Sequence, residues 1–161
     1  MTTIPPPRRR KLPTVDELRL WRQFIETAEA VRSELAARLQ NESGLSPADY
    51  RVLLALSEAA EHRLRPSELA STIEWDRSRL SHHLGRMERG GLIHREECAE
   101  DGRGAEVVLT SEGADAFRRS TVPHLRAVRE LFVDPLSPEQ LTAAAELASV
   151  LRSHIDAVRA G

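Results

Sequence analysis

The sequence predicts a mainly α-helical fold that carries one small β-hairpin. Only 4% of the 161 residues are aromatic, and alanine, leucine and arginine, which lose little conformational freedom in a helix, are abundant. Apolar residues recur at helical spacing through long stretches at both ends of the chain. Near the middle, two short strand-like runs flank the tight turn Asp101-Gly102-Arg103-Gly104. The length suits one domain of ordinary size.

Residues 1–13 are expected to form a disordered basic arm. Three consecutive prolines precede Arg8-Arg9-Arg10-Lys11, and this composition cannot bury enough apolar surface to fold alone. Two interpretations stay open, because the arm can either lie along DNA phosphates or remain a solvated tail.

Long helices are expected at both ends, over residues 14–45 and within residues 110–161. The first begins near Thr14 or Asp16, and the last follows the cap motif Ser137-Pro138-Glu139-Gln140. Their apolar stripes are wider than a small central domain can cover, so we expect these helices to be dimerisation helices of a homodimer. In the first helix the stripe consists of Val15, Leu18, Trp21 or Arg22, Ile25, Ala28, Val31, Leu35 and Leu39.

Residues 46–109 are expected to form a compact lobe of short helices and a hairpin. A cap serine, Ser46, opens a helix, and Pro66 to Ile73 form a second one. Asp76 can cap a third helix over about residues 77–89, which Gly90-Gly91 ends.

The hairpin occupies about residues 92–109. Its arms are Leu92-Ile93-His94-Arg95 and Glu106-Val107-Val108-Leu109, and its tip is the basic turn. Short helices followed by a charged hairpin and a new helix start are the layout of a winged helix-turn-helix. In that layout helix 77–89 is the recognition helix for the DNA major groove, and the hairpin is the wing for the minor groove.

The expected recognition helix has a polar outer face. Leu80, Leu84 and Met87 mark its buried side. Arginine can donate two parallel hydrogen bonds to guanine, and serine can bond base edges or phosphates. We expect His82 rather than its neighbour to make a contact, because His83 lies nearer the apolar side. The outer face holds Arg77, Ser78, Arg79, Ser81, His82, Gly85 and Arg86.

These motifs resemble the MarR family of transcriptional regulators. The resemblance extends over essentially the whole chain from about residue 14, and the wing with its exit is its most specific part. The matching runs are Leu-x-Pro-Ser-Glu-Leu-Ala from Leu64, Ser-Arg-Leu-Ser-His-His-Leu from Ser78, Glu-Arg-Gly-Gly-Leu-Ile from Glu88, and Asp101-x-Arg103 followed by Val107-x-Leu109-Thr110-x-x-Gly113.

The resemblance implies a homodimer, expected to be a repressor, that binds a pseudo-palindromic double-stranded operator. Arg103 matches the wing-tip arginine, Asp101 matches the acid that orients it, and Ser67 would approach a phosphate. Arg65 departs from the pattern, because related sequences commonly have a capping threonine there. The matches to recognition-helix contacts are Ser78, Arg79, Ser81, His82 and Arg86.

The resemblance also implies a ligand, because family members often bind small aromatic or phenolic acids. The candidate pocket walls are Trp21, Phe24, Tyr50 and Phe117. Ordinary core packing is the alternative for each of these aromatic residues, since aromatics at helical spacing usually serve packing.

Cys98, the single cysteine, lies on an expected wing strand. Its oxidation would disturb the wing, so a thiol-responsive regulator is an alternative. Arg95 would favour the thiolate, whereas the neighbouring glutamates oppose it. A lone cysteine excludes an intramolecular disulfide and disfavours a structural zinc site. Apart from the adjacent His82 and His83, the histidines have no convincing metal-ligand spacing, so we expect no metal and no other cofactor.

Other function classes find little support. The sequence has no glycine-rich phosphate loop and no strand-borne serine elbow, which argues against an enzyme. No run approaches the roughly 18 apolar residues of a membrane span, and we expect a cytoplasmic protein without a membrane partner. The net charge of −2 gives no global sign of a nucleic-acid partner. A winged helix that binds another protein through its polar face therefore remains an alternative.

Overall fold

The computed structural model describes residues 12–97 and 104–161, and the chain divides into two compact units, one up to Glu34 and the other over Leu35–Gly161. The fold is mainly helical with one small antiparallel sheet, as predicted. In order, the elements are α1 (Val15–Ser43), α2 (Pro47–Glu58), the 3₁₀ turn η1 (Ala60–His62), β1 (Arg63–Leu64), α3 (Pro66–Thr72), α4 (Arg77–Arg89), β2 (Ile93–Glu97), β3 (Ala105–Leu109), α5 (Ser111–Val128), the π-helical turn η2 (Arg129–Val133) and α6 (Pro138–Ala160).

Side-chain caps begin the helices where the sequence predicts them. Ser46 Oγ accepts from the Asp49 amide at 3.1 Å, and Asp49 Oδ2 accepts from the Ser46 amide at 2.9 Å. Ser137 caps α6 in a reciprocal pair with Gln140, and Asp76 caps α4. Each cap satisfies an amide that the first helical turn leaves without a partner. These local predictions are confirmed.

The sheet has one strand more than the sequence predicts. Its order is β1-β3-β2, with both pairs antiparallel. Leu64 is paired with Val107, and Val107 is paired on its other side with Arg95. β1 contains only two residues, which is too short to show the alternation of a strand. It attaches the segment before α3 to the base of the hairpin.

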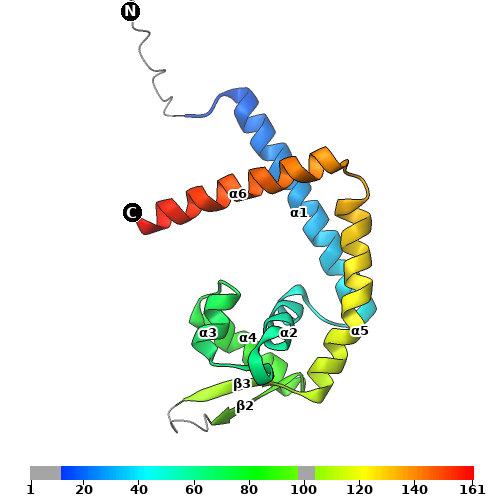
Figure 1. Cartoon of the computed structure of the whole chain (residues 1–161), viewed down its shortest axis with the longest axis vertical. Coiled ribbons are helices and arrows are strands. Elements are labelled where there is room, and N and C mark those ends of the chain that lie inside the picture. The colour runs from blue at the N-terminus through cyan, green and yellow to red at the C-terminus, as the bar shows by residue number, and fades with distance from the viewer. Residues whose placement is uncertain (1–11, 98–103) are drawn as a thin grey trace, which may run out of the picture. The chain divides into compact units, whose positions relative to one another are not determined.

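One apolar core holds α2, α3, α4 and the sheet together. Leu53, Leu56, Leu69, Leu80 and Leu84 are at most 1% exposed. Burying a side chain of this size contributes about 1.5–3 kcal/mol. Figure 1 shows α2, α3 and α4 gathered beside the β2–β3 hairpin. The apolar side of α4 is therefore packed in the core, and its outer face is held in a fixed position on the lobe.

Two helices outside this core, α5 and α6, are less buried than those within it. α5 continues through Pro123 and passes directly into η2. α6 contains no buried residue over its whole length. Across residues 12–97 and 104–161, no helix combines the length and the apolar character that crossing a bilayer requires.

Candidate nucleic-acid interface

The helix α4 separates an apolar side from a polar side. Leu80, Leu84 and Met87 are buried in the core, and the Asp76 cap fixes the first turn through a 2.8 Å bond from the Arg79 amide. The first turn contains no acidic residue. Six polar side chains expected at the interface are all exposed: Arg77, Ser78, Arg79, Ser81, His82 and Arg86.

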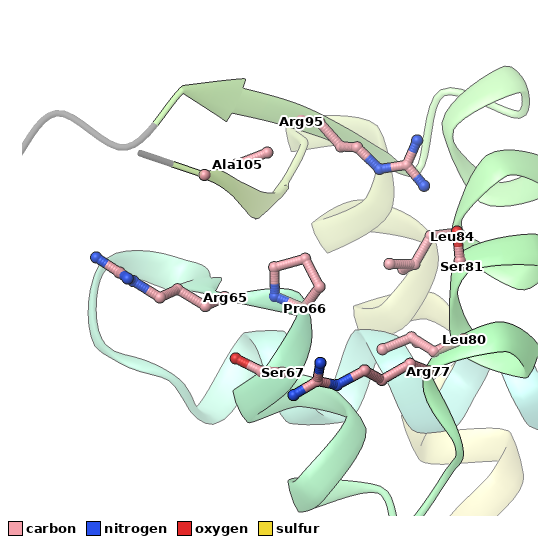
Figure 2. A pocket seen from close by; sticks show the side chains of 10 residues that line it. Arg65, Pro66, Ser67, Arg77, Leu80, Ser81, Leu84, Arg95 and Ala105 are labelled. Atoms are coloured by element: carbon pink, nitrogen blue, oxygen red, sulfur yellow. The ribbon is translucent and has the colours of Figure 1, made fainter. Parts of the chain in front are cut away.

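These side chains line two grooves, one on each side of the outer face. The wing-side groove has a volume of about 520 Å³ and lies between α4, the start of α3 and the hairpin. Figure 2 shows that side chains of all three parts surround it. Its lining consists of Arg65, Pro66, Ser67, Arg77, Leu80, Ser81, Leu84, Arg95, Gly104 and Ala105. The groove brings Ser67 of α3 together with Arg77 and Ser81 of α4.

Three arginines give the wing-side groove its charge. Arg95 is held by Glu88, whose carboxylate accepts from the Arg95 amide and from Nη1, both at 3.0 Å. Arg65 precedes α3, and its amide donates to Glu68 Oε2 at 3.0 Å. Because a guanidinium offers no acceptor, Arg65 cannot cap α3 as a threonine would. At this position the chain therefore has a cation beside the groove, where related sequences commonly have the hydroxyl of a capping threonine.

The α2-side groove has a volume of about 340 Å³ and lies beside the start of α2. His82 is exposed, whereas His83 is 4% exposed. Burial lowers the pKa of His83; the Asp49 carboxylate opposes this shift, and the Arg86 and Arg79 guanidinium groups add to it. His83 is therefore neutral at pH 7. The lining consists of Ala48, Trp75, Ser78, Arg79, His82, His83 and Arg86.

The base of the wing is fastened to α5. Thr110 Oγ1 donates to the Gly91 carbonyl at 2.7 Å and accepts from the Gly113 amide at 2.9 Å. Gly91 has a φ of +73°, which a glycine adopts without strain. The wing-tip predictions concern Asp101, Arg103 and Cys98, which lie outside the described residues. They stay predictions from the sequence.

A second cluster contains some of the expected ligand-pocket residues. The ring centroid of Tyr50 lies 5.2 Å from that of Phe117 and 4.6 Å from that of His124. Burial lowers the pKa of His124. Trp21 and Phe24 belong to the first unit, where their side chains are exposed. The ligand pocket remains a prediction.

Sequence reasoning missed several residues around α4. Trp75 precedes the cap of α4 and Asp49 lies in the first turn of α2, and both line or support the α2-side groove although neither is among the predicted contacts. Arg95 was considered for its effect on a thiol, although it lines the wing-side groove. The available signal is a tryptophan directly before the capping Asp76, where an aromatic ring can reach side chains of the first helical turn.

No metal centre competes with this interpretation in the part of the chain that the structure describes. Within residues 12–97 and 104–161, no group of three histidine, cysteine or acidic side chains is placed to hold a metal ion.

Comparisons with known proteins agree on one family. The MarR family model matches residues 43–104, a range that contains α3 and α4. The crystal structure of AbsC, a MarR family transcriptional regulator from Streptomyces coelicolor, is similar with a TM-score of 0.83 and 35% identity, covering 92% of this chain and 99% of that one. The same organism's Sco3205, a MarR family regulator crystallised in complex with DNA, is similar with a TM-score of 0.82 and 36% identity, covering 89% and 94%.

A curated relative matches a shorter stretch. The HTH-type transcriptional repressor YetL from Bacillus subtilis is 31% identical over 94 residues, which are 56% of this chain and 56% of that protein. The chain spans about half the length of the curated relatives it matches.

Proposed function

Because this chain belongs to the MarR family of transcriptional regulators, we propose that it binds a specific DNA duplex through α4 and represses transcription there. The exposed polar face of α4, between its two grooves, carries the proposal. Arginine and serine side chains on one face of a helix suit both base edges and phosphates. A DNA complex of a 36% identical structural neighbour supports the same use of the fold.

The proposed contacts divide by position. Arg77, Ser81 and Ser67 line the wing-side groove, and we propose that they bind a backbone phosphate there. Arg79 and Arg86 lie on the other side of α4, where a guanidinium can reach guanine in the major groove. Ser78 and His82 lie beside them. Arg103, oriented by Asp101, is proposed for the minor groove.

The proposed assembly is a homodimer on a pseudo-palindromic operator. Apolar side chains of α6 are exposed in the single chain, and so are apolar side chains of α1. Soluble proteins rarely leave such continuous stripes uncovered. A second copy would cover them and present a second α4, one helical turn away along the DNA.

Repression follows from the same arrangement, because a dimer bound across a promoter excludes polymerase from it. The relative YetL is a transcriptional repressor, which supports repression rather than activation. We further propose that a small aromatic or phenolic acid relieves repression, with Tyr50 and Phe117, whose ring centroids lie 5.2 Å apart, as candidate contacts. We propose that it acts through binding, without catalysis or a cofactor.

Selection of bound duplexes from a random library tests the function, followed by footprinting of the selected duplex. We expect two half-sites about one helical turn apart, bound with an affinity that falls steeply as salt rises. Replacing Arg77, Arg79 and Arg86 together with alanine should abolish this binding. The control replaces Arg119, Arg126 and Arg159, which are equally charged and exposed but lie on α5 and α6.

Failure to enrich any sequence would favour the alternative in which the polar face binds a protein. If the triple variant of α4 still binds the operator and the control variant does not, the DNA-binding surface is not on α4.

A further inference from the structure

Trp75 lies in the turn between α3 and α4, directly against a candidate DNA-contacting arginine. The Arg79 guanidinium carbon is 4.2 Å from the centroid of the Trp75 ring. A cation on an aromatic face is held by the ring quadrupole, and tryptophan is the strongest such partner. A guanidinium at this distance can lie with its flat face on the ring, and that arrangement leaves its in-plane N–H donors free. Those donors are the ones that bidentate recognition of guanine requires.

His83 supports this stack from the buried side. Its ring meets Trp75 edge-on, with centroids 5.4 Å apart and an interplanar angle of 88°. His83 Nδ1 lies 2.7 Å from Arg86 Nη2. Because a guanidinium can only donate, Nδ1 must be the acceptor, and the proton of the neutral ring is on Nε2. One imidazole therefore contacts both the Trp75 ring and the Arg86 side chain.

The imidazole is itself held by α2. His83 Nε2 lies 2.9 Å from Asp49 Oδ1, although this contact departs from ideal hydrogen-bond alignment. The other oxygen of Asp49 accepts from the amide and from the hydroxyl of Ser46, at 2.9 and 2.6 Å. Asp49 is thereby fixed by the cap of α2. A chain of contacts runs from this cap through His83 to two arginines of α4.

We propose that Trp75 and His83 are positioning residues for DNA recognition, which orient Arg79 and Arg86 before the duplex arrives. This inference rests on the proposed function of α4. Pre-orientation reduces the side-chain entropy that long arginines lose on binding. The benefit is specific to contacts that require one geometry, so it should appear in base discrimination more than in general attraction to DNA.

Protonation of His83 should release this arrangement. An imidazolium has N–H donors at both nitrogens, so Nδ1 could no longer accept from Arg86. The ring would then face a carboxylate of α2, Asp49, and two like charges of α4, Arg79 and Arg86. We expect specific binding to weaken as the pH falls below neutrality.

A double-mutant cycle tests the positioning by Trp75. The variants are Trp75→Leu, Arg79→Ala and their combination, and the affinity for the selected operator and for a random duplex is measured by fluorescence anisotropy at fixed salt. We expect Trp75→Leu to weaken operator binding about tenfold, with little change on random DNA and no further loss once Arg79 is absent. Trp75→Phe, which keeps an aromatic face, should restore most of the affinity.

The possible results distinguish failure of the positioning role from failure of the proposed DNA binding. A wild-type chain with no preferred duplex would overturn the proposed function. A selective wild-type chain with additive losses in the cycle, or equal losses on operator and random DNA, would overturn the positioning alone. Should Trp75→Leu not fold, NMR of the wild-type chain decides, because stacking predicts a ring-current shift of the Arg79 Nε–H signal and its absence contradicts the stack.

His83 is tested with a pair of near-isosteric variants. The amide oxygen of His83→Asn can take the place of Nδ1 and accept from Arg86, whereas His83→Leu offers no acceptor. We expect His83→Asn to retain discrimination and to lose the weakening between about pH 7 and pH 5.5, and His83→Leu to lose discrimination at both pH values. Equal pH profiles for the wild type and His83→Asn would contradict the role of this imidazole.

Discussion

At Gly113, α5 lies directly against the residue that precedes the first hairpin strand. A Cβ built on this residue would lie 2.0 Å from the carbonyl oxygen of Leu92, far inside van der Waals contact, and 2.9 Å from a side-chain carbon of Leu109. The Leu92 oxygen belongs to the backbone and already accepts from the Thr110 amide at 3.3 Å. The Leu109 side chain can turn away, but the backbone oxygen of Leu92 cannot.

Gly113→Ala should therefore destabilise the fold by about 1–3 kcal/mol or more, because overpacking forces the backbone to shift. Urea unfolding of both proteins measures the difference. The control is Gly85→Ala in α4, where the new methyl group meets only a side-chain atom of Arg89 at 3.7 Å. This variant should gain about 0.5–1 kcal/mol, as alanine usually does inside a helix. Equal stability of the two variants would refute the packing argument.

Single residues also show what the sequence could predict about the site. Serine and aspartate caps depend on neighbours three residues away, so Ser46, Asp76 and Ser137 were identifiable without a structure. The exposed face of α4 followed from helical spacing. The setting of His83 did not, because its partner Asp49 lies on another helix, and only the packed fold brings the two together.

At the scale of elements, long patterned segments were predictable and short ones were not. The helices and the hairpin carry enough residues for their periodicity to be visible. β1 has two residues and owes its existence to pairing with β3. The π-helical turn η2 also has no local signal, since nothing in Arg129–Val133 distinguishes it from an ordinary helical continuation. The grooves beside α4 depend on how several such elements pack.

The packing of α2 against α4 and α5 encloses two histidines whose titration should affect stability. Burial lowers the pKa of both His83 and His124 relative to the ordinary value of 6.5. The unfolded chain therefore takes up protons first as the pH falls through 6.5. The free energy of unfolding should decrease across that range, and the decrease should end below the folded-state pKa values.

Urea unfolding at about pH 7.5 and pH 5.5 measures this decrease. His124→Phe, which keeps a ring against Tyr50, should reduce the difference between the two pH values, and adding His83→Asn should reduce it further. The exposed His154→Asn serves as the control and should behave as the wild type does. A wild-type stability that rises on acidification would show that the sign assigned to the buried histidines is wrong.

At the scale of the whole molecule, the distribution of apolar residues matters more than their number. The net charge is −2, so attraction to DNA must come from local clusters of cations, and we propose that the arginines on and around α4 form one of them. The core of the lobe accounts for the apolar residues of α2 to β3. It does not account for α6, on which Leu147, Leu151, Ile155 and Val158 form a continuous exposed stripe.

Leu151→Glu combined with Ile155→Glu should break the proposed homodimer, because two carboxylates would be buried without partners at an apolar contact. Sedimentation velocity should show half the wild-type mass, with helical content unchanged by circular dichroism. Ser149→Glu is the matched control, since at about 100° per residue it lies on the opposite side of α6. Operator affinity should fall with dimer loss, because a monomer carries a single α4 and reads one half-site. A variant that stays dimeric would place the interface elsewhere, and a monomeric variant with undiminished operator affinity would remove the need for two copies.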